Sequence, residues 1–435
     1  MNFSKNQIIL MGAALLIVLV LIGIAVVPAF QKGGGNDKTK ITGALSIWGV
    51  SKSRSELDTV IASFNAVYPK VTVSYRNFET YGEYQQALLE ALASISGPDI
   101  FMIRNTDLPR MINKIVPIGS DALPAATLLD AFPQVVRQDF VQQNYTYALP
   151  LSIDTLALYY NRNLLDQATV AAPQTWEDFS AIIPKLTKYD SSGKITQSGA
   201  AIGSSVKSIT DAPSILELLM LQNGTAMVSP DFSNATFANS PEGVNALKFY
   251  TQFSDTRSKT YAWNDGFAND RDAFAQEKTA MMFGFASAIP DIKARNAFLN
   301  FGVIPAPQPA NAAVANRVSF PQYYGLAVSR QSQQQALAWE FIMDVTMSPT
   351  AAQQYFAATR KPPALKSVAI TDQNDVELGA FARQTLTARS WPQIDEDTIS
   401  AALSQAIMEV NTNAAIAETA LRKAQDAVTA LMGRK

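Results

Sequence analysis

The stretch from Ala148 to Asn161 constrains the fold of this chain more than any other part of the sequence. Its first half places β-branched or apolar residues at every second position: Leu149, Leu151, Ile153 and Thr155. Its second half, residues 156–160, is apolar throughout. Alternation predicts a strand with one buried face, and a continuous apolar run predicts a strand that helices cover on both sides. We therefore expect one strand that leaves one domain and enters another.

A single carboxylate interrupts this apolar stretch. Asp154 lies in the middle of the run, where an unpaired charge would be costly to bury. We predict that Asp154 faces a cleft and contributes to a binding site. An ion pair between two lobes is the alternative.

The same stretch carries a family resemblance. Pro150-Leu-Ser152 is followed by Ala157-Leu-Tyr-Tyr-Asn161 and then by Leu165, and this pattern resembles the signature of family 1 extracellular solute-binding proteins. These proteins are the ligand receptors of ABC importers, and the maltose-binding type is one of them. The signature usually ends in Lys, Asn, Asp or Glu, whereas this chain has Gln167.

Other segments extend the resemblance over most of the chain. The matching segments are Leu45-x-Ile47-Trp48, Phe64-x-x-x-Tyr68-Pro69, Gly97-Pro98-Asp99-Ile100 and Pro173-x-Thr175-Trp176. Between residues 44 and 103, strand and helix patterns alternate, with an expected capping box at Ser53-Arg-Ser-Glu56 and an expected N-cap at Thr175. The resemblance implies an α/β fold of two doubly wound lobes with a hinge, of the type II periplasmic-binding-protein-like kind.

Length and composition narrow the classes of function. The chain has 435 residues, enough for two domains, and it contains no Cys and no His. Cys–His and Ser–His–Asp catalysis and zinc sites are therefore excluded. A net charge of −2 gives no basic surface for nucleic acid. We predict no metal, no cofactor and no enzymatic activity, with a carbohydrate hydrolase built on a carboxylate pair as the alternative.

The predicted domain boundaries follow from these patterns. Residues 1–30 form a transmembrane anchor, because Ile8–Val27 is unbroken by charge and about 30 Å long as a helix. Residues 31–43 form a flexible tether rich in Gly and Lys. The expected first lobe comprises residues 44–151 and 320–366, and the expected second lobe comprises residues 152–319 and 367–435.

The flanking lysines and the family resemblance predict opposite orientations of the span. Lys5 precedes it, and Lys32, Lys38 and Lys40 follow it, so the positive-inside rule mildly favours a cytoplasmic body. The resemblance implies an outside body. We expect a protein of the cell membrane with one N-terminal span and its body on the outer face. Cleavage of a signal peptide near Val27-Pro-Ala29 is the alternative.

The candidate site combines aromatic faces with a few polar groups, as a reversible sugar receptor requires. Carried over by position from the family, the candidates at strand ends are Gly49, Ser51, Arg104 and Asn105. The candidate aromatic faces are Trp48, Phe285, Tyr324 and Trp391, and Asp154 is the candidate carboxylate. For each aromatic residue, packing in the core is the alternative.

The resemblance therefore predicts a membrane-tethered receptor. It would bind a small solute, a sugar or related polyol, and deliver it to the permease subunits of an ABC importer by hinge closure. A sensory receptor of the same fold is an open alternative, and the residues do not single out one ligand. Phe285 stands after Gly284, where sugar-binding members often carry a Trp.

Overall fold

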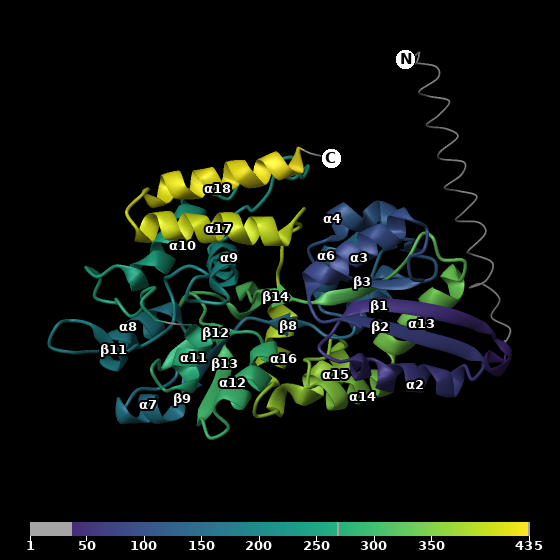
Figure 1. The fold of residues 1–435 in the computed structure, drawn as a ribbon, viewed down its shortest axis with the longest axis horizontal. Coiled ribbons are helices and arrows are strands. Elements are labelled where there is room, and N and C mark those ends of the chain that lie inside the picture. The colour runs from purple at the N-terminus through teal and green to yellow at the C-terminus, as the bar shows by residue number, and fades with distance from the viewer. Residues whose placement is uncertain (1–36, 268, 434–435) are drawn as a thin grey trace, which may run out of the picture.

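The computed structural model describes residues 37–267 and 269–433, and the chain forms two lobes that lie side by side (Figure 1). Each lobe has its own cluster of buried hydrophobic residues. The strands β8 and β14 lie between the lobes (Figure 1). The architecture is thus the two-lobed α/β arrangement that the resemblance implied.

The first lobe is built on a five-stranded sheet in the order β2-β1-β3-β15-β7. Its strands are β1 (Gly43–Val50), β2 (Val71–Phe78), β3 (Ile100–Arg104), β7 (Leu149–Pro150) and β15 (Tyr324–Val328). β1 pairs in parallel with both β2 and β3, whereas β15 runs antiparallel to β3 and to β7. Strand-helix-strand alternation produces this parallel core, because each parallel pair needs a crossover. The expected wound topology is present in this lobe.

Helices cover this sheet. They are α2 (Asp58–Val67), α3 (Tyr81–Ala93), α4 (Leu108–Met111), α5 (Ala125–Ala131), α6 (Gln134–Phe140), α13 (Gln335–Met347), α14 (Pro349–Thr359) and α15 (Lys366–Thr371). A small antiparallel sheet accompanies them, made of β4 (Ile118–Gly119), β5 (Val141–Gln142) and β6 (Tyr145–Thr146). The Thr80 hydroxyl accepts a hydrogen bond from the Glu83 amide and so caps α3, whose position brings Tyr81 to the end of β3.

The second lobe differs from the doubly wound expectation. Its main sheet has three strands, β9 (Ala157–Asn161), β12 (Met281–Gly284) and β13 (Phe301–Pro305), in the order β12-β9-β13. Both neighbours run antiparallel to β9. A separate hairpin joins β10 (Lys188–Tyr189) to β11 (Ile195–Gln197). The apolar run of β9 did predict a central, buried strand, but hydrophobicity alone does not distinguish parallel from antiparallel partners.

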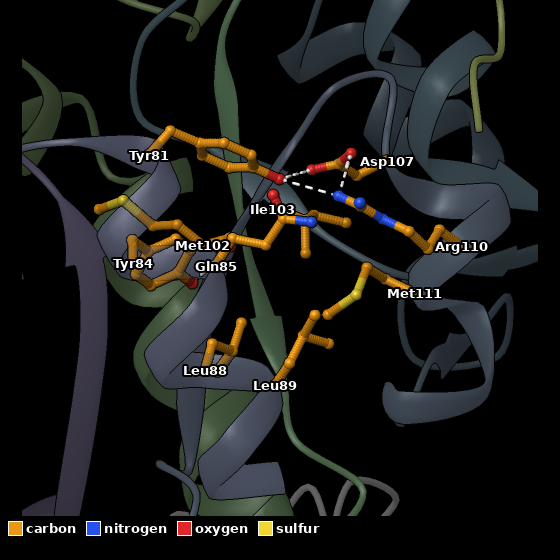
Figure 2. A pocket seen from close by; sticks show the side chains of 10 residues that line it. All are labelled: Tyr81, Tyr84, Gln85, Leu88, Leu89, Met102, Ile103, Asp107, Arg110 and Met111. Atoms are coloured by element: carbon orange, nitrogen blue, oxygen red, sulfur yellow. Dashed lines mark hydrogen bonds and ion pairs between the residues drawn. The ribbon is translucent and has the colours of Figure 1, made fainter. Parts of the chain in front are cut away.

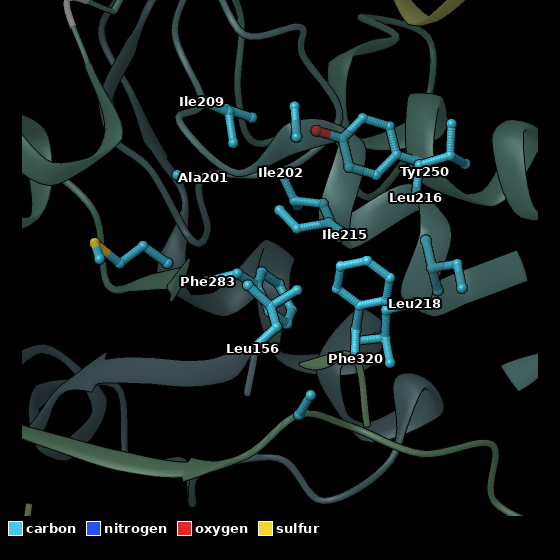
Figure 3. Packing of buried hydrophobic residues seen from close by; sticks show 14 of the residues in the cluster. Leu156, Ala201, Ile202, Ile209, Ile215, Leu216, Leu218, Tyr250, Phe283 and Phe320 are labelled. Atoms are coloured by element: carbon cyan, nitrogen blue, oxygen red, sulfur yellow. The ribbon is translucent and has the colours of Figure 1, made fainter. Parts of the chain in front are cut away.

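Helices form most of the second lobe. They are α7 (Arg162–Gln167), α8 (Trp176–Leu186), α9 (Ala212–Gln222), α10 (Pro241–Thr251), α11 (Asp270–Ala275), α12 (Ile289–Arg295), α16 (Gly379–Gln384), α17 (Glu396–Asn411) and α18 (Ala417–Met432). Figure 3 shows part of the core, where Phe283 of β12 and Phe320 lie near Ile215 and Leu218 of α9. The helix pair α17 and α18 forms a layer over this lobe, and the N-terminal end of α17 points toward the first lobe (Figure 1).

The hinge is a short antiparallel pair. β8 (Asp154–Thr155) pairs with β14 (Pro321–Gln322), and next to it the Leu156 amide donates to the Phe320 carbonyl at 2.9 Å. The expected continuous strand over 148–161 is therefore three short strands, β7, β8 and β9, because the chain changes partner at each step from one lobe to the next. A further passage lies between α15, which packs in the first core, and α16, which packs in the second.

Two expected helix caps have different outcomes. Thr175 and Asp178 form a reciprocal capping box at the start of α8, which confirms the expected N-cap. The capping box at Ser53–Glu56 is wrong. Ser53 caps a short 3₁₀ turn by accepting from the Ser55 amide, and Glu56 instead accepts from the Lys52 amide. That turn is η2 (Arg54–Glu56), and the other 3₁₀ turns of the described residues are η1 (Lys38–Lys40), η3 (Ile112–Lys114), η4 (Gln252–Ser254), η5 (Ala286–Ala288), η6 (Val314–Asn316), η7 (Asp372–Asn374) and η8 (Thr385–Thr387).

The predicted membrane span, Ile8–Val27, lies outside the described residues, as do residues 31–36 of the predicted tether. Within residues 37–267 and 269–433, no helix has both the length and the apolar character needed to cross a bilayer. The anchor therefore stays a prediction.

Candidate ligand-binding seam between the two lobes

The lobes meet through polar side chains, and we call this interface the seam. It comprises residues 104–106 and Asp139 of the first lobe, Gln322 of the hinge strand, and residues 390–397 with Glu217 of the second lobe. The end of β3 and the start of α17 supply its central residues. These groups come from segments far apart in the sequence, which only the docking of the lobes brings together.

Arg104 is the cation of the seam. It is the last residue of β3, and its guanidinium lies 3.4 Å from the centre of the Tyr81 ring. Tyr324 is its partner in the β3–β15 register, with the Tyr81 and Tyr324 rings 6.2 Å apart. Only 12% of the Arg104 side chain is exposed. Burial disfavours the guanidinium charge, but the carboxylate of Glu396 and its other neighbours hold the pKa of Arg104 above its ordinary value.

Two carboxylates from the first turn of α17 face these groups. Arg104 Nη1 lies 2.9 Å from Asp397 Oδ1 and 3.9 Å from Glu396 Oε1. Glu396 also accepts hydrogen bonds from the Thr106 hydroxyl at 2.8 Å and from the Gln322 amide at 3.2 Å. The first turn of a helix favours negative charge, so α17 stabilises both carboxylates locally. Glu396 thus occupies donors that would otherwise be open to a solute.

A buried carboxyl joins a second set of seam contacts. Asp139 of α6 accepts from the Asn105 amide at 3.2 Å, from the Tyr323 hydroxyl at 2.7 Å and from the Ser390 hydroxyl. Burial raises the pKa of Asp139 to about 7, against the opposite effect of these hydrogen bonds. Gln138 adds a bond from its amide to the Ser390 carbonyl at 2.5 Å. Asp139 therefore connects the first lobe, the hinge and the second lobe.

Glu217 of α9 forms a third buried group. One of its oxygens accepts from the indole nitrogen of Trp391 at 2.7 Å and from the Gln393 amide at 3.0 Å. Burial raises the pKa of Glu217 to about 8, the hydrogen bond from Trp391 lowers it, and the nearby charge of Glu396 raises it further. Gln393 also contacts the first lobe: its backbone amide donates to the Thr106 carbonyl at 3.3 Å.

Asp154 lies in the hinge, where its carboxylate accepts hydrogen bonds from backbone amides. Its carboxylate accepts from the backbone amides of Ala286 at 2.8 Å, Ser287 at 3.0 Å and Thr155 at 2.9 Å. Burial raises the pKa of Asp154 to about 6, and these amides act in the opposite direction. Asp154 therefore fixes η5 to the hinge strand. The ion pair considered as an alternative does not form among the described residues, and the expected cleft-facing role of Asp154 stays a prediction.

The predicted aromatic faces have different positions. Trp391 and Phe285 are 3% and 2% exposed and belong to the second core, so neither presents an open face in this conformation. Tyr324 reaches the seam beside Arg104. Trp48 is half-buried, and the Arg76 guanidinium lies over it, 4.5 Å from the centre of the Trp48 ring. Large side chains at lobe interfaces are often part of the core, which sequence alone does not reveal.

The predicted residues at the end of β1 stay within the first lobe. The space beside Gly49 is filled by the Met102 side chain, whose sulfur lies 2.6 Å from where a Cβ would stand. Ser51 is buried and shares a hydrogen bond of 2.9 Å with the Tyr75 hydroxyl. Among the described residues, no hydrogen bond, ion pair or ring contact joins Trp48, Gly49 or Ser51 to the second lobe. The structure thus brings Arg104, Asn105, Tyr324 and Trp391 to the seam and leaves the β1 residues apart.

A small cavity lies behind the seam in the first lobe (Figure 2). It is lined by Tyr81, Tyr84, Gln85, Leu88, Leu89, Met102, Ile103, Asp107, Arg110 and Met111. The Tyr81 hydroxyl donates to Asp107, and Arg110 Nη2 lies 3.0 Å from Asp107. Its volume of about 10 Å³ has room for about one water molecule. This cavity is too small for a sugar, but its polar wall holds Tyr81 in place under Arg104.

A second, larger hollow lies outside the seam. It has a volume of about 220 Å³ and is lined by Tyr160, Arg162, Leu165, Asp166, Val170, Ala171 and Ala172 of the second lobe. Arg162 is fixed there by a bond from Nε to the Phe301 carbonyl at 3.2 Å. None of the seam residues lines this hollow.

Sequence reasoning missed several seam residues, above all Glu217, Glu396 and Asp397. The only local signal was the acidic run at residues 395–397 before a helical pattern, which is typical of any helix start. Glu217 is a carboxylate within an apolar helix, a pattern that indicates a buried partner but does not identify it.

Comparison with known proteins adds one matching family and three similar solved structures. A family model described as bacterial extracellular solute-binding protein matches residues 59–380. The cyclic α-maltosyl-1,6-maltose binding protein from Arthrobacter globiformis is similar in structure, with a TM-score of 0.75, 18% identity, and coverage of 91% of this chain and 100% of that one. A cyclo/maltodextrin-binding protein complexed with maltotetraose has a TM-score of 0.74, 19% identity, and coverage of 93% and 99%.

The GacH receptor of Streptomyces glaucescens, described both unliganded and with acarbose, has a TM-score of 0.69, 22% identity, and coverage of 91% of this chain and 100% of that one. At these identities the solved structures establish a shared fold. The family model covers most of the chain, including the hinge and the end of β3.

Proposed function

This chain belongs to the bacterial extracellular solute-binding protein family, and on that premise we propose that it binds a carbohydrate in the seam and delivers it to an ABC importer. The family is one of binding proteins, in agreement with the prediction that the chain is not an enzyme. The observation that carries the proposal is the seam itself, where two lobes on a two-stranded hinge face one another with hydrogen-bonding side chains.

The chemistry of the seam suits hydroxyl groups. Arg104, Thr106 and Gln322 offer donors, whereas Glu396 and Asp397 offer acceptors. A sugar hydroxyl donates one hydrogen bond and accepts others, so it can satisfy both sets at once. Several proteins of the same fold carry names that state a bound sugar, including maltotetraose and mannobiose. We take Arg104, Asn105 and Tyr324 as the predicted residues that contact the solute, with Thr106, Gln322 and Glu396 added.

Binding would act through the hinge. A solute can shift the balance between open and closed lobes only by binding one arrangement more tightly than the other. In the closed arrangement both lobes contact the solute, which therefore favours closure about β8 and β14. The closed lobes would then form the surface that the permease subunits recognise.

The membrane anchor is part of the same proposal. Ile8–Val27 would hold the protein in the cell membrane by a single span, with the tether keeping the body on the outer face near its permease. Protease added to intact cells should then remove the body. Full protection of the body in intact cells, with cleavage after lysis, would contradict the outside orientation.

Calorimetric titration of the protein with maltose, maltotetraose, mannobiose and tagatose tests the central claim. We expect heat of binding for at least one sugar, and recovery of that sugar unchanged. Arg104→Ala should weaken the binding, whereas Arg257→Ala, which removes an exposed pair with Asp255, should not. Absence of binding to the whole series would overturn the carbohydrate proposal, and consumption of the sugar would favour a hydrolase.

A further inference from the structure

We propose that Glu396 and Asp397 determine which sugars the seam accepts, and that they exclude anionic sugars such as uronic acids and sugar phosphates. The inference rests on the proposed function, since it concerns the solute of the same site. It starts from the ring and carboxylate partners that Arg104 already has in the seam.

Arg104 would be the obvious anchor for an anionic solute, but its environment makes it unavailable. Tyr81 covers one face of the guanidinium at 3.4 Å. Asp397 takes one edge at 2.9 Å, and Glu396 lies at 3.9 Å. The neighbouring cation Arg110 is itself paired with Asp107 at 3.0 Å. Arg104 and Arg110 therefore each already have a carboxylate partner.

Negative groups outnumber positive groups along the seam. Glu396 and Asp397 face the single cation Arg104, whereas the buried carboxyls of Glu217 and Asp139, whose pKa values burial raises to about 8 and about 7, add no positive charge. The remaining titratable groups that act on Arg104 are the phenols of Tyr81 and Tyr324, which are neutral. An anion that displaced Glu396 from its donors would remain next to that carboxylate in a closed, poorly hydrated interface.

Hydrogen-bonding capacity leads to the same result. Glu396 accepts from Thr106 and Gln322. A neutral hydroxyl can enter this arrangement because it accepts from one of these donors and donates to the carboxylate. A fully ionised carboxylate or phosphate group can only accept, so a solute that places this group against Glu396 would leave that carboxylate without a donor. Glu396 thereby favours solutes that bring hydroxyl or amino hydrogens.

The experiment measures the ratio of the affinities for neutral and acidic sugars, and not the affinity for one sugar alone. The full chain is titrated with tagatose, maltose, maltotetraose and mannobiose, and with glucuronate, galacturonate and glucose 6-phosphate, at fixed low ionic strength. We expect the best neutral sugar to bind about tenfold or more tightly than any of the acids. The double variant Glu396→Gln and Asp397→Asn keeps similar shape and should narrow this ratio several-fold by admitting the acids.

Controls separate discrimination from damage to the fold. Glu409→Gln alters the other end of the same helix, where Glu409 pairs with Lys423 at 2.9 Å, and it should leave the ratio unchanged. Melting curves of both variants report whether the lobes remain folded.

The outcomes distinguish this inference from the function on which it rests. An acid that binds the wild type as tightly as the best neutral sugar would overturn the inference and leave a carbohydrate receptor in place. An unchanged ratio in the double variant would overturn it as well. Failure of every neutral and acidic sugar to bind would overturn the carbohydrate proposal and this inference with it.

Discussion

Arg104 at the end of β3 and Asp397 in the first turn of α17 form an ion pair of 2.9 Å between the two lobes. The two residues are 293 positions apart in the sequence. Their contact exists because the hinge brings the carboxyl end of β3 in the first lobe against the start of α17 in the second lobe. It makes the seam a place where closure of the lobes and recognition of a solute depend on the same side chains.

Removal of the cation should loosen the lobes. In Arg104→Ala, Glu396 and Asp397 lose their positive partner at a mostly buried position, and we expect a loss of about 1–3 kcal/mol in the free energy of unfolding. Urea unfolding measures this loss, and X-ray scattering should show a larger radius of gyration without solute. Arg257→Ala, at an exposed pair within the second lobe, should change stability by less than about 0.5 kcal/mol. An equal effect of both changes would contradict a role in holding the lobes.

Glu217 should make stability depend on pH. Because burial raises the pKa of Glu217 from 4.5 to about 8 in the folded protein, the folded state holds a proton that the unfolded chain releases. Its contribution to stability is full below about pH 4.5 and is lost as the pH rises toward about 8. In Glu217→Gln, whose side-chain oxygen can still accept from Trp391, this part of the slope should vanish.

Urea unfolding at a series of pH values between 4 and 9 measures that slope. The matched control is Glu418→Gln, which alters an exposed pair with Lys248 and should keep the wild-type profile. A Glu217→Gln profile as steep as that of the wild type would show that Glu217 titrates normally. Burial raises the pKa of Asp139 to about 7. Stability of Glu217→Gln should therefore still fall as the pH rises, but less steeply than stability of the wild type.

Trp391 should act mainly on stability. Trp391→Phe keeps a ring in the second core but removes the indole donor to Glu217. We expect a loss of about 1–3 kcal/mol, because a buried carboxyl loses one of two hydrogen bonds. Combined with Glu217→Leu, which removes the acceptor, the two losses should be less than additive, since both changes remove the same hydrogen bond. Fully additive losses of unfolding free energy would mean that the Trp391–Glu217 bond is not formed in solution.

Asp154 should act as a hinge cap. Asp154→Ala leaves the amides of Ala286 and Ser287 without their acceptor, and we expect a loss of about 1–2 kcal/mol in the free energy of unfolding. Asp154→Asn keeps one carbonyl acceptor and should lose less. Calorimetric binding of the best sugar should change little in Asp154→Asn. A large loss of affinity at unchanged stability would return Asp154 to the solute site that its sequence position suggested.

Much of the first lobe could be predicted from local patterns. The alternating strands and helices before residue 104, and likewise the cap at Thr175 in the second lobe, depend on residues only a few positions apart. The passage through residues 148–161 was recognised, but its division into three strands was not, because the chain there exchanges pairing partners that belong to different lobes. The antiparallel sheet of the second lobe was missed for a related reason: a buried strand has the same composition whichever way its neighbours run.

The site shows the same division. Arg104 and Asn105 were carried over by position from the family resemblance, which agrees with the rule that ligands bind at the carboxyl ends of strands, and Tyr324 was a candidate aromatic face; the structure places all three at the seam. Asp154 was placed in the solute site because a carboxylate in an apolar strand suggests a cleft, and Trp391 because of the family resemblance. Their partners are two backbone amides of η5 and a carboxyl of α9.

The sequence by itself determined the strand and helix patterns, the class of fold, the absence of Cys and His chemistry, and the resemblance to solute-binding proteins. These depend on side-chain periodicity and composition, which are properties of the chain before it folds. Only the tertiary structure decided which carboxylates face Arg104, which aromatic rings are buried, and where the lobes touch. Such pairings depend on distances between segments hundreds of residues apart, and those distances are fixed only when two packed cores dock about the hinge.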